Sequence, residues 1–414
     1  MAKNNIIIGL DVGTSKVRAI VASVKPKEEI KPKIIGIGES DSLGMRKGVV
    51  VDIEEMTKSI KRAIDQAERS SGVHIEKAYV SVGGSHIRAK TSKGIIAVSR
   101  ADEEVSQDDV IRAISNASAV SMDPNREVIH VIPREFSIDG QSGIQDPRGM
   151  TGVRLEVDAL IIEGLTPYIK NLRKCLSNTG VEIQGLVLDI LASSNSVLLR
   201  KQKELGVLVL DLGGGTASMS VYEERKLIHI NVLPIGSSHI TNDIAIGLRT
   251  SIETAEKIKL EHGTCLINSV GKKEEIDLSN FDEKEEGVAD RKEVVKIIEA
   301  RIEEIFHLVN KELKKIDRER LLPSGAVLIG GGAKIPGIVD LAKQRLKLPV
   351  QIGNPQGFDG LADKVDDPSF ATATGLIMWA LEVGGNKDRF KDKTFLNLKN
   401  MFNKIKNWFK SFSP

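Results

Sequence analysis

Two stretches of the chain repeat one pattern of hydrophobic and polar positions, about 200 residues apart. Each has an apolar run, an Asp-x-Gly turn and a second apolar run: IIIGLDVGTSKVRAIVASV near the start and GVLVLDLGGGTASMSVY from Gly206. Short apolar runs bounded by turn residues are typical of strands, so both stretches are predicted hairpins. Helical stretches follow each hairpin, and then a strand ends in glycines, AYVSVGGSHI and GAVLIGGGAKIPG. The repetition predicts a duplicated α/β unit with helices on the sheet faces.

Polar residues at the two hairpin turns suit the binding of a polyanion. The run from Gly213 to Gly215 holds more glycine than a tight turn needs, which favours close approach of a ligand to this backbone. Facing turns would direct backbone N–H groups at phosphates. Hydroxyl groups and one cation stand beside them, in Thr14, Ser15, Thr216 and Lys16. Asp11 and Asp211 are placed to hold Mg²⁺ through its water shell, since Mg²⁺ prefers oxygen ligands and retains water.

A third glycine cluster, Gly330, Gly331 and Gly332, follows the last strand of the second repeat and leaves flat backbone on which a purine or ribose fits. Each motif taken alone is also explained by ordinary turn chemistry. All three occur in one order after equivalent strands, and that combination favours a nucleoside triphosphate site.

Length and composition limit the class of protein. A chain of 414 residues predicts two or more domains, and 41% apolar with 28% charged residues is typical of a soluble globular protein. Cys175 and Cys265 are isolated, so neither a metal-binding spacing nor a disulfide framework is expected. The amino-terminal apolar run is too short for a cleavable signal, and no run is long enough to span a bilayer.

Residues 385–414 differ from the rest of the chain: they hold eight Lys or Arg, two Asp and five of the ten Phe. Wound as a helix at about 100° per residue, their apolar side chains fall within an arc of about 140°. These side chains are Phe395, Leu398, Met401, Phe402, Ile405, Trp408, Phe409 and Phe412, with Lys399, Lys406 and Lys410 along one edge. Core packing, protein docking and nucleic-acid binding are alternatives, but an interfacial helix on an anionic membrane explains both faces, and no nucleic-acid partner is expected.

The quoted hairpins resemble those of the actin-type ATPase superfamily. Within it, the segments EVIHVIPREFSIDGQSGIQDPRGMTGVRLEV, LASSNSVL and SIETAEKIKLEHG make the whole chain similar to the bacterial cell-division FtsA family. The resemblance implies an α/β, actin-like duplicated fold: two lobes around a nucleotide cleft, an α+β insertion subdomain and a C-terminal amphipathic helix. It also implies ATP and Mg²⁺ as cofactors.

The resemblance assigns roles residue by residue. The first phosphate loop would be Asp11, Gly13, Thr14, Ser15 and Lys16, and the second Asp211, Gly213, Gly214, Gly215 and Thr216. Gly330 to Gly332 would face the adenosine, and Glu256 and Lys259 the nucleoside, although such a pair is also typical of a solvated helix face. Asp189 falls where relatives orient the attacking water; an ordinary helix N-cap is the alternative.

The resemblance also implies a division into lobes. Expected are a first lobe of 1–83, 163–200 and 365–384, an insertion at 84–162, a second-lobe core of 201–250 and 318–364, a second insertion at 251–317, and a linker with the membrane helix at 385–414. The second insertion would dock the carboxy-terminal tail of FtsZ, and Arg301 is a candidate contact there. The body helix ATATGLIMWALEV is expected to end at the glycines that follow it.

The implied function is an ATP-binding protein, at most a slow ATPase, that polymerises on the cytoplasmic face of the cell membrane at the division site. It would anchor FtsZ there and recruit later division proteins. The alternatives are a sugar-kinase-like phosphotransferase, which would need an acceptor pocket with a general base, and another membrane-linked actin-like scaffold of the pilus-assembly type.

Overall fold

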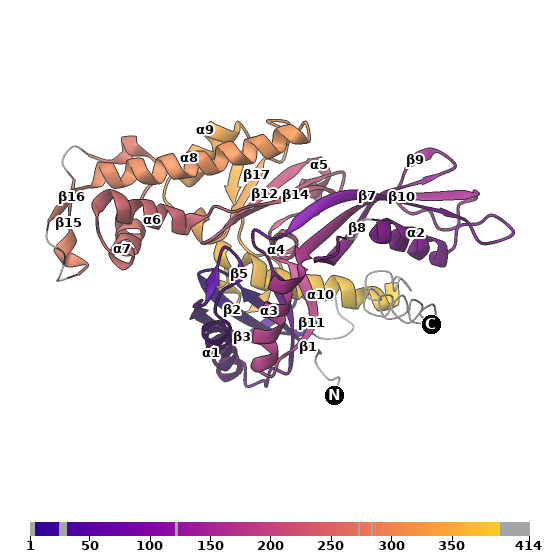
Figure 1. Ribbon diagram of the computed structural model, residues 1–414, viewed down its shortest axis with the longest axis horizontal. Helices are drawn as coiled ribbons and strands as arrows, with labels where there is room; N and C mark the ends of the chain where they lie inside the picture. The colour runs from indigo at the N-terminus through magenta and orange to yellow at the C-terminus, as the bar shows by residue number, and fades with distance from the viewer. Residues whose placement is uncertain are drawn as a thin grey trace.

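The computed structural model describes residues 5–24, 31–120, 123–271, 274–282, 285 and 287–389. Two mixed sheets form its two lobes (Figure 1). The first has the order β11-β6-β1-β2-β3-β19, with bounds Glu182–Leu188, Lys77–Val82, Asn5–Val12, Lys16–Val24, Lys33–Asp41 and Asp359–Gly360. The second has the order β14-β13-β12-β17-β18, with bounds Lys226–Leu233, Ala217–Glu223, Val207–Leu212, Ala326–Ile329 and Val350–Ile352.

Both sheets share one topology. In the first, β1, β2 and β3 form an antiparallel meander, while β6 lies parallel to β1 and β11 parallel to β6. In the second, β12, β13 and β14 form the same meander, while β17 lies parallel to β12 and β18 parallel to β17. The duplicated α/β unit predicted from the sequence repeat is therefore confirmed.

The helices of the first lobe pack around the first sheet. The set comprises α1 (Ile53–Ser71), α3 (Thr166–Asn178), α4 (Asp189–Val197) and α10 (Ala371–Arg389). Asp52 caps α1 by accepting from two backbone N–H groups, and Gly72 ends it in the left-handed region at φ 69°. A Cβ on Gly38 of β3 would overlap the Ala63 carbonyl of α1, so glycine allows this helix to lie close to the sheet.

The second lobe carries α5 (Arg200–Leu205), α6 (Ser237–Leu248), α7 (Ile252–His262), α8 (Arg291–Lys315) and α9 (Ile338–Leu346). In α8 a buried row recurs at helical spacing, Val294, Ile298, Ile302, Ile305 and Val309. The charged stretch before α8 contains a short antiparallel pair, β15 (Glu275–Asp277) with β16 (Val288–Asp290). Arg301 of α8 is already bound to Asp243, with Nε–Oδ2 and Nη2–Oδ1 distances of 2.6 and 2.8 Å.

An inserted subdomain lies between β6 and α3 and extends away from the two lobes (Figure 1). It has the order β7 (Arg88–Ala97), α2 (Gln107–Val120), β8 (Arg126–Ile138), β9 (Gln141–Ile144) and β10 (Arg154–Leu165). The strands form an antiparallel sheet, β7-β10-β8-β9, against which α2 buries Val110, Ala113 and Ala117. This is an α+β module with its own apolar core.

The expected end of the last body helix at residue 383 is wrong, because α10 continues through Gly384 and Gly385 to Arg389. Two glycines cost roughly 1 kcal/mol each in a helix, which an otherwise helical sequence tolerates. The membrane-helix residues, from Phe395 to Phe412 with their lysines, lie outside the described residues. No helix within the described ranges is long and apolar enough to cross a membrane.

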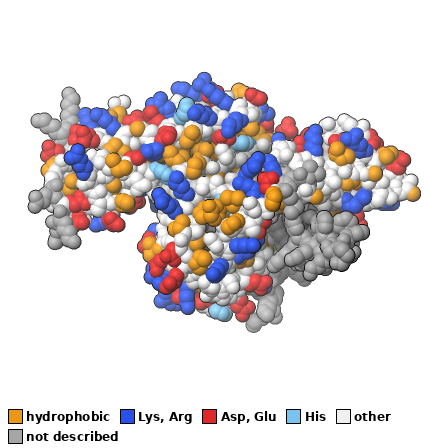
Figure 2. All heavy atoms as spheres, in the orientation of Figure 1, with side chains coloured by type: hydrophobic (Ala, Val, Ile, Leu, Met, Phe, Trp, Pro, Cys, Tyr) orange, Lys and Arg blue, Asp and Glu red, His pale blue; other side chains and the backbone are white. Residues whose placement is uncertain are grey.

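Charge of both signs is interspersed over the face of the lobes shown in Figure 2. Lys and Arg side chains alternate there with Asp and Glu, and apolar side chains gather near the centre of the view.

Candidate functional site

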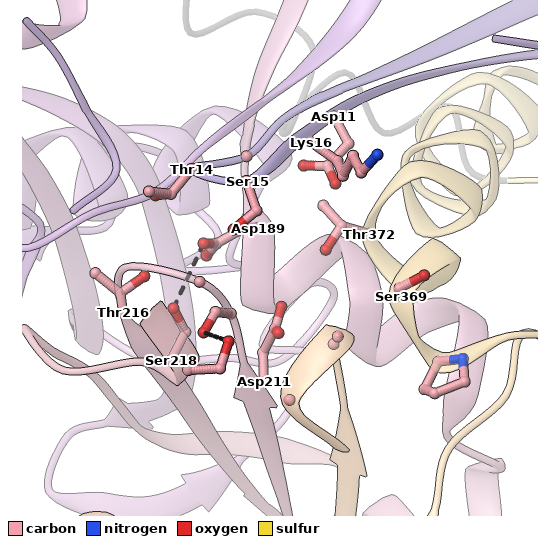
Figure 3. A pocket seen from close by; sticks show the side chains of 18 of the residues that line it. Asp11, Thr14, Ser15, Lys16, Asp189, Asp211, Thr216, Ser218, Ser369 and Thr372 are labelled. Carbon is pink, nitrogen blue, oxygen red and sulfur yellow. Dashed lines mark hydrogen bonds between the residues drawn. The ribbon is translucent and has the colours of Figure 1, made fainter. Parts of the chain in front are cut away.

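A cavity of about 390 Å³ lies between the lobes and is lined by both hairpin turns. Figure 3 shows Asp11, Ser15 and Lys16 at one side, Asp211, Thr216 and Ser218 at the other, and Asp189 between them. Of the predicted site residues, the structure brings together in this lining Asp11, Gly13, Thr14, Ser15, Lys16, Asp189, Asp211, Gly213, Gly214, Thr216, Glu256, Lys259, Gly330, Gly331 and Gly332. Gly215 lies outside the lining.

The first turn is rich in side-chain functions. The Gly13 N–H donates to the Lys16 carbonyl at 3.1 Å and closes the hairpin. The Thr14 hydroxyl accepts from the N–H of Gly48, which lies in the tight turn between β4 (Met45–Arg46) and β5 (Val49–Val50). Lys16 is 39% exposed at its side chain and forms an ion pair with Asp41 at 2.8 Å. An exposed ion pair of this kind is weak, so the ammonium group remains able to turn to an anion.

The second turn, at Gly213–Gly215, carries no side chains and accepts hydrogen bonds from the start of α6. The N–H groups of Ser237 and Ser238 donate to the carbonyls of Gly213 and Gly214 at 2.8 and 2.9 Å. A Cβ on Gly214 would overlap the Ser15 hydroxyl, and a Cβ on Gly215 would come within 2.8 Å of Lys47 Cα. The glycines therefore let the two turns approach each other across the lobes.

The third glycine cluster continues from β17. Gly330 has φ 83°, and a Cβ there would overlap the Asp211 carboxylate and lie 2.8 Å from the Leu212 carbonyl. Nothing lies within 4 Å of a Cβ built on Gly331, so this backbone faces open space. Glycine is thus required at the first position and leaves access to the cavity at the second.

Lys259 is buried, whereas the Glu256 side chain is 44% exposed, so only half of the pair fits a solvated helix face. Lys259 is only 8% exposed, and its Nζ donates to the Thr241 hydroxyl at 2.9 Å and to Glu256 Oε2 at 2.6 Å. Thr241 also donates to the Glu256 carboxylate. Glu256, Lys259 and Thr241 thus form one hydrogen-bonded group, of which Glu256 and Lys259 line the cavity.

Three buried carboxyl groups converge on the cavity. Burial raises the pKa of Asp11, which Ser81 partly offsets by donating to Oδ1 at 2.8 Å. Burial, assisted by the charge of Asp11, raises the pKa of Asp189 to about 7, while burial and repulsion from Asp189 and Asp11 raise the pKa of Asp211 to about 8. The cluster strongly favours a cation or protons in this space. No three metal-ligating side chains in the described ranges are close enough to hold one ion directly.

Asp189 is the first residue of α4, and Leu188 occupies the N-cap position. The Ile190 N–H donates to Asp189 Oδ1 at 2.6 Å, and the Ser218 hydroxyl donates to Oδ2 at 3.4 Å (Figure 3). A Cβ on Gly83 would overlap this carboxylate. The side chain therefore contacts its own helix start and also lines the cavity.

Several lining residues were not found from the sequence. They include Arg18, Gly48, Ser81, Gly83, Gly84, Ser218, Ser237, Lys334, Ser369 and Thr372. Gly83 and Gly84 end the strand β6 just as Gly330 and Gly331 end β17, so the repeat itself contained the signal for them. Ser369 and Thr372 arrive from a segment 350 residues away from the first turn, and no local pattern marks them.

Comparison with known proteins identifies the family. The family model "Cell division protein FtsA" matches residues 208–375, and the model "SHS2 domain inserted in FTSA" matches residues 84–163. The cell division protein FtsA of Pseudomonas aeruginosa is 38% identical over 91% of this chain and 89% of its own length. The chain belongs to the FtsA family. FtsA of Bacillus subtilis is 36% identical over 94% of this chain and 88% of its own length.

Solved structures support the actin-like fold expected for an FtsA. A PilM-PilN type IV pilus biogenesis complex chain aligns with a TM-score of 0.64 at 16% identity, covering 91% of this chain and 98% of that chain. MreB 5 of Spiroplasma citri bound to AMPPNP aligns with a TM-score of 0.54 at 15% identity, covering 93% and 98%. The actin-like fold with an inserted subdomain is therefore confirmed. The family models and the curated relatives, rather than the solved structures, favour the cell-division family over the pilus-assembly alternative.

Proposed function

We propose that the protein binds Mg-ATP between its lobes and polymerises on the cytoplasmic face of the cell membrane at the division site. There it anchors FtsZ and recruits later division proteins. The observation that carries the proposal is the pair of turns facing one cavity, with glycine backbone and hydroxyl groups from both lobes. A ligand that contacts both turns stabilises the closed arrangement of the lobes, and this differential affinity would bias the chain toward its polymerising state.

Each group in the cavity suits one part of the nucleotide. The N–H groups of the two turns and the Lys16 ammonium face the phosphates, because the glycine backbone of the turns offers N–H donors and Lys16 adds a positive charge beside the first turn. Gly331 leaves open space at its Cα for the adenosine, and Lys259 with Glu256 offers a donor and an acceptor beside it. Asp189, the remaining carboxyl, lies where it can orient a water molecule.

Mg²⁺ fits the donor set. Asp11 and Asp211 supply hard oxygen atoms from the two lobes. Burial raises the pKa of both carboxyl groups, and repulsion from Asp189 and Asp11 adds to the effect at Asp211, so a bound cation would favour the ionised forms. The carboxylates would hold the ion through water, in keeping with the spread of side chains too wide for direct ligation within the described ranges. Bound Mg²⁺ would neutralise the charge that the phosphates add to this site.

Nucleotide binding is tested by calorimetric titration of the full-length chain with ATP in Mg²⁺ and in excess EDTA. Binding of one ATP per chain that weakens sharply in EDTA supports the proposal. A cavity that leaves ATP unbound in both conditions contradicts it. Addition of candidate sugar acceptors distinguishes the kinase alternative, because only a phosphotransferase would turn over ATP faster with an acceptor.

Membrane anchoring is tested by sedimentation with vesicles that contain phosphatidylglycerol, with and without FtsZ. Trp408→Glu places a charge on the predicted apolar stripe, whereas Asn407→Glu places the same charge on the opposite face. Loss of pelleting in the first variant, with retention in the second, supports the anchor. Equal recruitment of FtsZ to vesicles by a chain truncated after Gly385 contradicts it.

A further inference from the structure

His130 joins the inserted subdomain to the base of the nucleotide cleft. It lies on β8, is 7% exposed, and its Nε2 accepts the Leu188 N–H at 3.0 Å in a fully buried bond. Its ring also lies against Trp379 of α10, with 5.1 Å between the ring centroids. One side chain thus contacts both the end of β11 and the middle of α10, two elements of the first lobe.

The Leu188 N–H has a special place in the fold. Leu188 is the last residue of β11, an edge strand of the first sheet, and also the N-cap of α4, where no side chain of its own caps the helix. It is completely buried. A buried N–H without a partner costs about 1 to 3 kcal/mol, so His130 fixes the backbone at the point where strand changes to helix.

The next residue along the chain is Asp189. Its carboxylate fits between the Cα of Gly83 and the hydroxyl of Ser218, so small movements of the backbone at Leu188 would move it out of place. Burial lowers the pKa of His130 to about 4, which leaves the ring neutral at physiological pH and Nε2 free to accept. The ring accepts the N–H of Leu188, and the carboxylate of the next residue accepts the N–H of Ile190, so both fix the same short stretch of backbone.

We propose that His130 is a positioning residue for Asp189, through which the inserted subdomain holds this carboxylate toward the cavity. The inference rests on the proposed nucleotide site and goes beyond it, because it assigns to a residue outside the cleft a control over turnover. Removal of the Nε2 acceptor should affect the orientation of Asp189 and hence hydrolysis, while the phosphate-binding turns and the affinity for Mg-ATP stay nearly unchanged.

The test compares His130→Phe, which keeps an aromatic ring beside Trp379 but removes the acceptor, with His130→Gln, which can return an oxygen near the position of Nε2. Each is made in the full chain, alone and combined with Asp189→Asn. Measured are Mg-ATP affinity, phosphate release in a single turnover, thermal stability and amide hydrogen exchange of Leu188 and Ile190. Thermal stability identifies a variant that fails to fold.

His130→Phe is expected to slow phosphate release about tenfold with less than about a threefold change in affinity, and His130→Gln to recover most of the rate. In the Asp189→Asn background the His130→Phe change should have no further effect, since residues acting as a unit are not additive. An equal loss in both backgrounds overturns the inference. If the wild type fails to bind ATP, the proposed function fails. The positioning role is then decided by amide hydrogen exchange: faster exchange at Leu188 in His130→Phe that is restored in His130→Gln supports it, and unchanged exchange overturns it.

Discussion

The two lobes have the same strand order but treat their equivalent aspartates differently. Asp11 is the penultimate residue of β1 and receives a hydrogen bond from Ser81 at 2.8 Å, with Arg18 lowering its pKa against the effect of burial. Asp211 stands at the same point of the second lobe, and no side-chain donor to it occurs in the described part of the chain. Its pKa rises to about 8. Ser81 and Arg18 therefore partly offset the cost of an ionised Asp11 in the first lobe, whereas ionised Asp211 in the second lobe would be stabilised mainly by a bound cation.

A second equivalence joins the lobes. Gly83 follows β6 and Gly330 follows β17, and each lacks a Cβ that would overlap a carboxylate, Asp189 in the first case and Asp211 in the second. Each lobe therefore has, directly after equivalent strands, a glycine that makes room for an acid, although the acid comes from a different element in each lobe. The site therefore depends on paired glycine and carboxylate positions as well as on the turns.

The largest effect is expected from Asp211→Asn. This variant should bind ATP in Mg²⁺ about 100-fold more weakly, as loss of a carboxylate that orients metal-bound water does, and should respond little to EDTA. Asp108→Asn, an exposed charge on α2, is the control for lost charge. Calorimetric titration checks the result, and unchanged Mg²⁺-dependent affinity would remove Asp211 from the metal site.

Alanine at the two equivalent glycines comes next. Gly330→Ala should lower the free energy of unfolding by about 2 kcal/mol, because φ 83° is strained for alanine and the Cβ meets Asp211. Gly83→Ala should displace Asp189 at a similar cost. Gly331→Ala, which has open space, is the matched control and should change stability by less than about 0.5 kcal/mol. Urea unfolding measures all three, and equal effects at 330 and 331 would contradict the packing argument.

Without nucleotide, the free energy of unfolding should depend on pH. A carboxyl group whose pKa is raised on folding stabilises the protein at low pH, and this contribution is lost as pH rises through the folded-state pKa. With Asp189 at about 7 and Asp211 at about 8, stability should fall between pH 6.5 and 8 by on the order of 1 kcal/mol. His86 and His130, with pKa values lowered by burial from 6.5 to about 4, act in the opposite direction, because stability rises with pH until their unfolded-state imidazoles have lost their protons near pH 6.5. The fall should therefore be clearest above pH 7.

Thermal unfolding at several pH values checks this slope. Asp211→Asn should flatten it, since the amide resembles the protonated acid, and saturating Mg-ATP should flatten it in the wild type. A slope that persists in Asp211→Asn together with Asp189→Asn would show that other groups titrate there.

The smallest effect is expected from Ser81→Ala, which makes the first lobe resemble the second. Loss of the hydroxyl should cost about 0.5 to 1 kcal/mol and should raise the pKa of Asp11 further. Infrared titration of the carboxyl band measures that pKa. Ser92→Ala is a control, since its buried hydroxyl donates to a backbone carbonyl within the inserted subdomain. An unchanged Asp11 would contradict the difference between the lobes.

Local patterns were sufficient for much of this site. Both hairpin turns and the cluster at Gly330 follow from apolar runs ending in Asp and Gly, and the repeat predicted the duplicated sheets. Ser81 and His130 could not be found in this way, because each acts through a contact with a residue far along the chain, 70 and 58 positions away. Asp189 came only from the family resemblance, since a strand that ends in Leu-Asp before a helix also fits an ordinary cap.

The most direct measurement is an experimental structure of the full-length chain with Mg²⁺ and a non-hydrolysable ATP analogue at saturation. The account predicts the triphosphate between the turn at Gly13–Lys16 and the turn at Gly213–Thr216, with a hydrated metal ion between Asp11 and Asp211. A cleft that holds only water under these conditions, or a nucleotide bound away from both turns, would contradict it.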